Sequence, residues 1–397
     1  MLRLFIYLVV TGAILFVQKT YAQVAKVQAD ASLKHLKLAD SIIKYDLPKG
    51  SLWRPYSFIT SNVDGANDLW IIDSNKSTIM LLDYPSMATK ATINVKDFLA
   101  QTDTTEEQSI VATLRIHNDT IIVLCNREIL KYALSIKKIV NRVRINQWNS
   151  KRGWDPQAIE PFAFGQEIVY DSKRQCCYFY AYSTNHGWSK KSFYRQASVA
   201  MLTLSDFVVK PLQVTHPSVY QKYYVGDMVN SQIHVNGDTL LINWLCFPVI
   251  SRYVWANDSL RYLDEINSTA SKNDTVQQKW LPWSRKLPPV GIRREIIIQQ
   301  RVYDQIVYGK DINYRFFKAA QKLIGEDSTY NALNAKTVSL QLLNRDFTAQ
   351  TEFVLDGPQV ASARRAIYYK SALHILDAEL VYKPSSDLLV YVVQAAQ

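Results

Sequence analysis

Three segments of the chain bring tryptophan together with lysine, arginine or histidine, and each is bounded by residues that favour turns. They are residues 147–156, residues 185–195 and residues 280–286, the last followed closely by Arg293. A flat indole face can stack on a sugar ring, and a guanidinium group can hold a carboxylate through two hydrogen bonds. We therefore predict that the three segments share one end of the fold and form a ligand-binding surface there. The candidate ligand-binding residues are Trp148, Lys151, Arg152, Trp154, His186, Trp188, Arg195, Trp283, Arg285 and Arg293.

A purely structural role is the alternative for the same segments. Each tryptophan would then fill a gap between neighbouring structural units, and the lysines and arginines would be ordinary solvated charges. The substitution Trp154→Ala separates the two interpretations. A binding role predicts weaker binding at an unchanged unfolding temperature, whereas a packing role predicts loss of the fold.

Enzyme motifs with a local signature are absent from the sequence. There is no Gly-x-Ser-x-Gly elbow, no phosphate-binding glycine-rich loop, no His-Glu-x-x-His and no EF-hand spacing. Glycoside hydrolysis needs only two carboxylates, which can come from distant parts of a chain, and Asp155, Glu160, Glu167 and Glu295 are candidates for such a pair. Because the chain has 35 acidic residues, most of them are expected to be solvated surface charges.

Histidine and cysteine show no spacing typical of a metal site. The sequence has no Cys-x-x-Cys and no His-x-x-x-His, so we expect neither a metal nor another cofactor. Of the six histidines, only His186 lies in one of the tryptophan-containing segments. Cys176 and Cys177 lie in one apolar run, where a strand would point them to opposite faces. We expect no bond between these two, and buried structural roles for all four cysteines.

The first 22 residues have the features of an export signal. A positive start at Arg3 precedes an uncharged apolar run at 4–17, and residues 20–22 supply the small side chains of a cleavage site. The run is shorter than the roughly 20 residues that a membrane-spanning helix needs. An uncleaved anchor is the alternative. A lipoprotein is not expected, because the first cysteine is Cys125.

The balance of charge is basic. The chain carries 46 Lys and Arg residues against 35 Asp and Glu residues, a formal net charge of +11, and the leader contributes only Arg3 and Lys19. For a protein exported to the periplasm or beyond, a positive surface favours an anionic polysaccharide of the envelope, lipid headgroups or an acidic protein as partner. No nucleic-acid motif is present. A membrane contact is expected only through the leader, if it stays uncleaved.

The rest of the chain repeats one pattern, a polar turn followed by a short run of β-branched or aromatic residues. Asn118-Asp119 leads into the apolar run 121–125, and Asn236-Gly237-Asp238 leads into the run 240–244. Asn, Asp and Gly accept the positive φ angle that tight hairpin turns need. Paired strands of this kind form six units, at residues 70–82, 121–134, 166–204, 233–255, 295–343 and 366–393.

One segment departs from the β pattern. Residues 311–325 place apolar side chains at helical spacing, with Asp311 as a possible N-cap and Gly325 as a C-terminal stop. We expect a short helix inserted there, in the fifth unit. Residues 24–45 are ambiguous, because their first part suits a helix and residues 41–45 also suit a strand.

With these turns and paired strands, the chain resembles secreted β-propellers of the TolB-like, NHL-like and YncE-like kind, including uncharacterised exported proteins of Gram-negative bacteria. The resemblance covers most of residues 50–395 and implies an all-β propeller with six or, alternatively, seven blades. A pair of β-sandwiches or a jelly-roll array is the alternative fold. We expect a signal peptide at 1–22, an N-terminal segment at 23–49 and a single propeller domain at 50–397.

Three functional hypotheses follow from the sequence. The first is an exported, non-enzymatic propeller of the bacterial envelope that binds a polysaccharide or a protein through the aromatic and basic segments. The second is a carbohydrate-active enzyme with paired carboxylates. The third is a scaffold within an envelope complex, which a large exposed apolar patch would favour.

Overall fold

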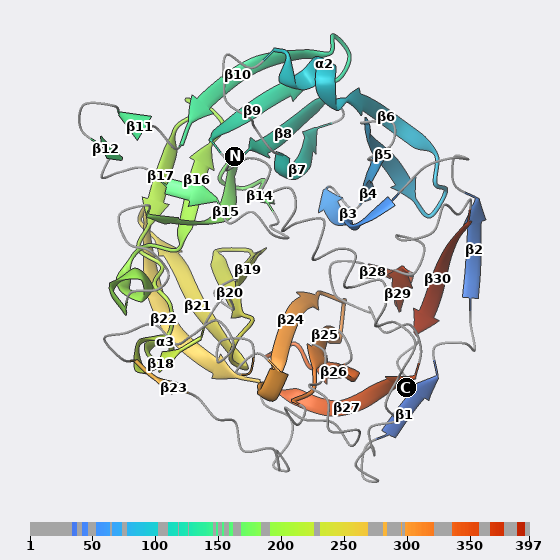
Figure 1. Cartoon of the computed structure of the whole chain (residues 1–397), viewed down its shortest axis with the longest axis vertical. Coiled ribbons are helices and arrows are strands. Elements are labelled where there is room, and N and C mark those ends of the chain that lie inside the picture. Colours follow the sequence, from blue (N-terminus) through green and yellow to red (C-terminus); the bar gives the residue numbers. More distant parts are fainter. Residues whose placement is uncertain are drawn as a thin grey trace, which may run out of the picture.

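The computed structural model of the chain is a six-bladed β-propeller, in which small antiparallel sheets stand around a common axis (Figure 1). The prediction of an all-β propeller with six blades is confirmed. The structure describes residues 34–37, 42–46, 53–63, 66–73, 78–101, 110–117, 119–125, 127–145, 148–149, 153–154, 159–161, 168–183, 191–225, 231–268, 281–283, 295, 298–320, 336–356, 366–376 and 387–393.

Each blade begins with the strand nearest to the axis and ends at the outer edge of the ring (Figure 1). The first three blades have these strands: in blade I β3 (Trp53–Val63), β4 (Ala66–Asp73), β5 (Thr78–Tyr84) and β6 (Thr89–Asn94); in blade II β7 (Ile110–His117), β8 (Thr120–Cys125), β9 (Glu128–Ala133) and β10 (Lys138–Arg144); in blade III β14 (Ile168–Asp171), β15 (Cys176–Ser183), β16 (Val199–Thr203) and β17 (Val209–Leu212). In blade III, β13 (Ile159–Pro161) also pairs with β15.

The other three blades follow the same plan. Their strands are, in blade IV, β19 (Ser231–Asn236), β20 (Thr239–Trp244), β21 (Val249–Ala256) and β22 (Ser259–Asn267); in blade V, β24 (Val302–Val307), β25 (Asn313–Lys318), β26 (Val338–Leu343) and β27 (Ala349–Asp356); in blade VI, β28 (Ala366–Tyr369), β29 (Ala372–Leu376) and β30 (Asp387–Val393). The small elements between blades are α2 (Val95–Leu99), β11 (Trp148–Asn149), β12 (Gly153–Trp154), the 3-10 helix η2 (Lys191–Arg195), α3 (Ser218–Lys222), β18 (Tyr223–Tyr224) and β23 (Leu281–Pro282).

The N-terminal part of the chain closes the ring. Strand β2 (Ile42–Asp46) pairs antiparallel with β30 and becomes the outer strand of blade VI. Strand β1 (Lys34–Lys37) adds to blade V as a fifth strand, parallel to β27. Both strands lie in the segment 23–49 that the sequence analysis placed before the propeller, and residues 42–45 adopt the strand alternative of that ambiguous region.

The two ends of the ring differ, because connections between antiparallel strands alternate from one end to the other. Connections between the first and second and between the third and fourth strands of a blade are short, such as 172–175, 237–238 and 257–258. We call this the short-turn end. At the opposite end, the long-loop end, the connections include 145–167, 184–198 and 268–301.

The turns at the short-turn end can be short because residues in them adopt left-handed backbone conformations. Gly237, Asn257 and Asp258 have φ angles of 59°, 49° and 60°, as hairpin turns of this length require. Every residue with positive φ in the described ranges lies in one of these short turns. The prediction that Asn, Asp and Gly punctuate the strands is confirmed at these positions.

Each of the six interfaces between neighbouring blades holds its own cluster of buried apolar side chains. Successive residues of a strand face opposite neighbours. Cys176 therefore packs in the cluster between blades III and IV, whereas Cys177 packs in the cluster between blades II and III. All four cysteines are buried, as the sequence predicted, and all four are free in the structure.

The expected helix at 311–325 is wrong over the part that the structure describes. Residues 313–318 form β25, which pairs with β24 on one side and β26 on the other. Tyr314 and Phe316 fill the interface with blade VI, while Arg315 faces blade IV. Both faces of a central blade strand are buried, so its apolar run lacks the alternation that identifies a half-exposed strand. Residues 321–325 lie outside the described ranges.

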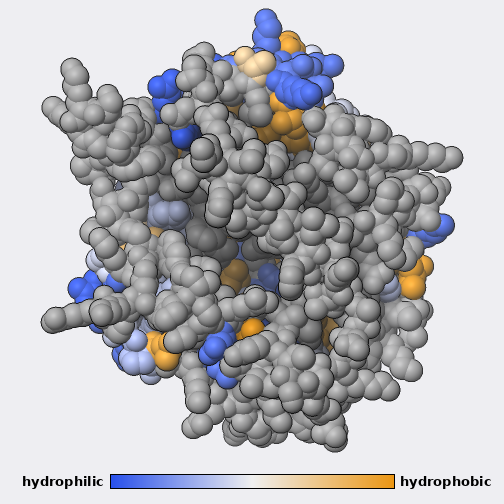
Figure 2. Space-filling view, viewed as in Figure 1, coloured by the Kyte–Doolittle hydropathy of each residue, from blue (hydrophilic) through white to orange (hydrophobic). Residues whose placement is uncertain are grey.

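Large apolar side chains remain exposed mainly on or beside the outer strands of the blades. They are Ile42 and Ile43 on β2, Ile136 and Val140 at β10, Val208 before β17, and Tyr262 and Leu263 on β22. In Figure 2, orange groups of this kind appear at the edge of the ring beside blue ones. None of the helices in the described ranges combines the length and hydropathy needed to span a bilayer.

Candidate functional site

Two of the three predicted aromatic and basic segments meet beside α3, between blades III and IV. Arg195, at the end of η2, donates from Nε to Gln221 Oε1 on α3 over 3.2 Å. Trp283, directly after β23, donates from its indole nitrogen to the carbonyl of Tyr220 on α3 over 3.0 Å. We call Lys191, Arg195, Gln221, Lys222 and Trp283 the α3 patch.

The α3 patch lies at the long-loop end. Lys191 and Arg195 lie in the connection after β15, Gln221 and Lys222 in the connection after β17, and Trp283 in the connection after β22. In Figure 1, α3, β18 and β23 appear together at the outer edge, next to β22. The backbone pairing of β18 with β23, Tyr223 to Pro282 and Tyr224 to Leu281, ties the two connections to each other.

An aromatic cluster beneath the patch holds it in place. His216 is buried at its centre, with its ring 5.1 Å from Tyr194, 5.3 Å from Tyr220 and 4.8 Å from Trp244 between centroids. Its Nε2 shares a hydrogen bond of 3.1 Å with the hydroxyl of Tyr180. Because these rings come from η2, α3 and strands of both blades, the cluster fixes the patch to the rigid part of the fold.

Within the described residues, the α3 patch is positively charged. Lys191, Arg195 and Lys222 are exposed, and none of the three forms an ion pair within the described part of the chain. Trp283 is half-buried, packing on Tyr194 at 5.4 Å and on Tyr224 at 5.3 Å between ring centroids. The arrangement offers cations for an anionic group beside an indole that is already oriented.

The structure describes few of the other predicted residues. The backbones of Trp148 and Trp154 pair with each other in the small β11–β12 hairpin, which lies beyond β17 in Figure 1. The hairpin belongs to the connection 145–167 and is thus attached at the long-loop end. The remaining candidates lie outside the described residues: Lys151, Arg152, His186, Trp188, Arg285 and Arg293.

Sequence analysis missed Gln221 and Lys222. Its search required tryptophan next to basic residues, whereas α3 contributes its polar side chains from a helix that carries no tryptophan. The available signal was Pro217, since proline is common at the start of a helix. Nothing in the sequence alone placed this helix against Arg195 and Trp283.

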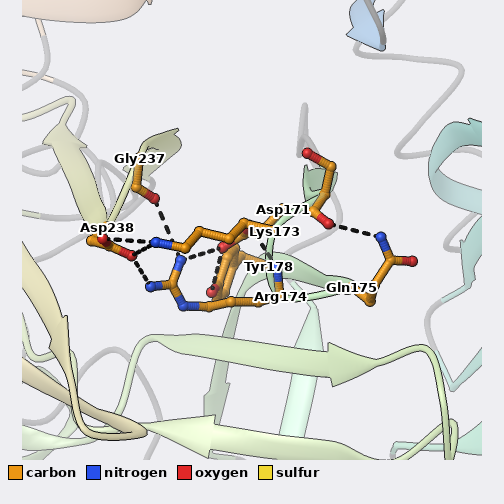
Figure 3. A network of polar contacts seen from close by, with 8 residues as sticks. Asp171, Lys173, Arg174, Gln175, Tyr178, Gly237 and Asp238 are labelled. Carbon is orange, nitrogen blue, oxygen red and sulfur yellow. Dashed lines mark hydrogen bonds and ion pairs between the residues drawn. The ribbon is translucent and has the colours of Figure 1, made fainter.

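At the short-turn end, by contrast, the cations near blades III and IV are paired (Figure 3). Lys173 contacts Asp238 at 2.7 Å, and Arg174 contacts both Asp238 and Asp171, the latter at 3.1 Å. The two basic partners hold the pKa of the Asp238 carboxyl below its usual range. This network joins the β14–β15 turn to the β19–β20 turn, so its charges serve the contact between blades.

The interface between blades IV and V carries a buried polar seam that sequence reasoning did not find. Arg315 is fully buried and donates to Asn243 Oδ1 at 2.5 Å and to the hydroxyl of Ser268, with its guanidinium 4.4 Å from the Tyr303 ring centroid. Burial lowers its pKa to about 10. The side chain of Gln232 bonds both backbone groups of Ile306. These bonds satisfy several buried groups across the seam, whereas Arg315 Nε and Gln341 Oε1 have no hydrogen-bond partner in the described residues.

Carboxylates that lie close together in the described residues share a basic partner: Asp68 and Asp83 contact the same nitrogen of Lys90, at 3.0 Å and 2.5 Å. Four carboxylates in the described part of the chain are buried: Asp68, Asp171 and Glu352 each contact an arginine, and Glu128 also has an interaction partner. Of the four carboxylates considered for hydrolysis, Glu295 is half-buried, Glu160 lies in β13, and Asp155 and Glu167 lie outside the described residues. No group of three or more His, Cys, Asp or Glu residues with metal-binding geometry occurs in the described ranges.

Comparison with known proteins supports the fold. No protein family matches the sequence, and no curated protein matches it. The crystal structure of a DUF4221 family member from Bacteroides vulgatus is similar, with a TM-score of 0.61 and 16% identity over 89% of this chain and 96% of that one. A weaker similarity is to a provisionally named exported protein from Bacteroides fragilis, with a TM-score of 0.47 and 9% identity over 94% of this chain and 98% of that one. Another is to a luciferin-regenerating enzyme, with a TM-score of 0.42 and 9% identity over 90% of this chain and 98% of that one. At these identities the first similarity shows a shared fold and no activity.

Proposed function

We propose that this chain is an exported, non-enzymatic propeller that binds an anionic polysaccharide of the bacterial envelope at the α3 patch. The observation that carries the proposal is the meeting of Arg195 and Trp283 on α3, together with two further cations that have no ion-pair partner in the described residues. The export part of the proposal rests on the apolar run 4–17 and the small residues at 20–22.

An acidic sugar polymer suits the chemistry of the patch better than a neutral one. Lys191, Arg195 and Lys222 supply charge, and the half-buried indole of Trp283 supplies an apolar surface whose orientation is set by its bond to Tyr220. Sugar rings stack on such surfaces, and carboxylate or sulfate groups accept hydrogen bonds from the cations. An acidic protein is the other partner class and is an outcome of the experiment below.

The test is a binding screen of the purified chain against anionic and neutral polysaccharides at low and moderate salt. We expect anionic polymers to bind, with an affinity that falls as salt rises, because exposed charges are screened. Arg195→Glu and Lys222→Glu should each weaken binding about fivefold or more, the equivalent of ~1 kcal/mol.

Lys210→Glu is the matched control, since Lys210 is an exposed lysine on β17 of the same blade but is remote from α3. Binding that is equally weakened by Lys210→Glu would reflect net charge and would contradict the assigned site. Shortened polysaccharide products would favour the enzyme hypothesis. Absence of any polysaccharide binding would refute the proposed ligand and direct the search to an acidic protein partner.

A further inference from the structure

The outer edge of blade II is the second uncompensated basic surface of the described structure. Strand β10 and the turn before it form the stretch 135–145, which contains four cations and no acid. In the sequence, no acidic residue occurs between Glu128 and Asp155. We call Ile136, Lys137, Lys138, Val140 and Arg144 the β10 edge.

Cations and aliphatic side chains are exposed together on the β10 edge. Ile136 and Val140 are 58% and 50% exposed, and Lys137, Lys138 and Arg144 are exposed without an ion pair in the described residues. Val140 stands at a break in register, where β10 has one more residue than β9. In Figure 2, blue and orange groups lie side by side over the edge that carries α2 and β10 in Figure 1.

In the described residues no acid forms an ion pair with Lys137, Lys138 or Arg144. Asp119 uses its carboxylate on Ser135, accepting from the backbone nitrogen at 2.5 Å and from the hydroxyl at 2.7 Å. This contact also fixes the turn that presents Ile136 and Lys137. The turn thus fixes the position of Lys137, while Lys138 and Arg144 are exposed on β10 itself.

The backbone of the edge is partly occupied, which disfavours the addition of a strand from another protein. Gln101, after α2, accepts from the backbone nitrogen of Ile139 at 3.1 Å and donates to the carbonyl of Lys137 at 3.3 Å. The register break at Val140 interrupts the remaining ladder, and lysine on an edge strand also opposes pairing. The side chains of the edge, and not its backbone, are thus available to a partner.

Aliphatic side chains among cations fit a lipid surface better than a sugar. Sugar-binding surfaces use flat aromatic rings, and none of the five residues of the β10 edge is aromatic. Isoleucine and valine gain from entering the apolar part of an interface, while lysine and arginine stay at the level of anionic headgroups. We propose that the β10 edge docks the propeller on membranes that contain anionic lipid.

The outer strand β22 of blade IV provides an internal comparison. It exposes Tyr262 and Leu263 by 56% and 53%, similar to the aliphatic residues of the β10 edge. Its charges differ, because Arg261 is accompanied by Asp264 and Glu265, and Asp264 is already paired with Arg252. An anionic lipid surface should therefore bind the β10 edge and not β22, because the two edges have similar apolar exposure and differ in charge.

The test is co-sedimentation of the full chain with vesicles of phosphatidylcholine alone or with about a third of phosphatidylglycerol, at low and high salt. We expect binding only to the anionic vesicles, reduced by salt. Each cation contributes about fivefold to such binding. Replacing Lys137, Lys138 and Arg144 together by Gln should lower the partition coefficient on the order of a hundredfold, and Val140→Ser should lower it several-fold.

The control combines Arg261→Gln with Leu263→Ser on β22 and should bind as the unmodified chain does. The unfolding temperature of each variant shows whether it is folded, and all the replaced side chains are exposed. Failure of the chain to bind anionic vesicles at low salt would overturn the proposal, as would equal loss of binding in the β22 control. The proposal is independent of the α3 patch, because Arg195→Glu and Lys222→Glu should leave the binding of vesicles within about twofold.

Discussion

His234 is a titratable side chain that the fold keeps neutral. Its ring stacks on Tyr308 with 3.4 Å between centroids and an angle of 9° between planes. Burial lowers its pKa to about 4 from the ordinary value of 6.5. Below pH 6.5 the unfolded chain therefore binds a proton at this position that the folded chain does not bind, and the folded state loses relative stability.

This shift predicts a pH dependence with a defined sign. The stabilising contribution of neutral His234 is fully present above pH 6.5. Its loss as the pH falls from 7.5 to 4.5 should lower the unfolding free energy by roughly 2 kcal/mol. Burial lowers the pKa of His374 as well, so the whole protein loses more. Urea unfolding at the two pH values should show a smaller loss in His234→Phe, which keeps the stacked ring. An unchanged pH dependence in this variant would contradict the assignment.

The four cysteines give a second prediction at the residue scale. Burial raises the pKa of Cys125 to about 12 and that of Cys176 to about 11, and it also raises the pKa values of Cys177 and Cys246. Since the thiolate is the reactive form, we expect iodoacetamide to modify less than about a tenth of the thiols in the folded protein at pH 8. In denaturant all four should react. Rapid modification of Cys176 or Cys177 in the folded state would show that their strand is less buried than described.

Of the two N-terminal strands, β2 has the larger expected effect on stability. It pairs with β30 over five residues and joins the two ends of the chain in blade VI, and its Tyr45 packs near Tyr84 of blade I. Strand β1 only extends blade V, whose four other strands are complete without it.

Truncation distinguishes the two N-terminal strands. Removal of residues 1–37 should lower the free energy of unfolding by no more than about 1.5 kcal/mol. Removal of residues 1–46 should lower it by about 3 to 5 kcal/mol, because blade VI then loses its outer strand and the interface with blade I loses apolar contacts. Chemical denaturation of the two shortened chains measures the difference. Equal stability of the two would refute closure of the ring by β2.

The elements that sequence analysis predicted well are those with local signals. The turn at Gly237 and Asp238 was predictable because few residues adopt positive φ, and the paired strands around it follow from their β-branched side chains. Strand β25 was not predictable, because Tyr314, Phe316 and Phe317 satisfy a helical spacing as well as a buried strand. Its identity depends on β24 and β26, which are distant in sequence.

The α3 patch shows the same limit. The composition around Arg195 and Trp283 marked each segment as a candidate. The two residues are 88 positions apart, and they come together only because each bonds to the helix α3, which lies between them in the sequence. Such a meeting is set by the propeller topology, which joins neighbouring blades at the long-loop end. The sequence could identify the residue types and not the arrangement.

At the scale of the whole molecule, the cations around blades III and IV differ between the two ends of the ring. Lys173 and Arg174 at the short-turn end are paired with Asp171 and Asp238, whereas the α3 patch at the long-loop end has cations without such partners in the described residues. Loops on a rigid ring are suited to binding, and tight paired turns are suited to holding blades together.

Hydrogen exchange with and without a bound anionic polysaccharide tests this central claim most directly. We expect the ligand to slow exchange in peptides that cover residues 191–195, 218–224 and 281–283, and to leave the turns at 172–175 and 237–238 unchanged, because binding orders the backbone only where the polymer contacts it. Protection confined to the short-turn end, or spread equally over both ends, would contradict a binding site at the α3 patch.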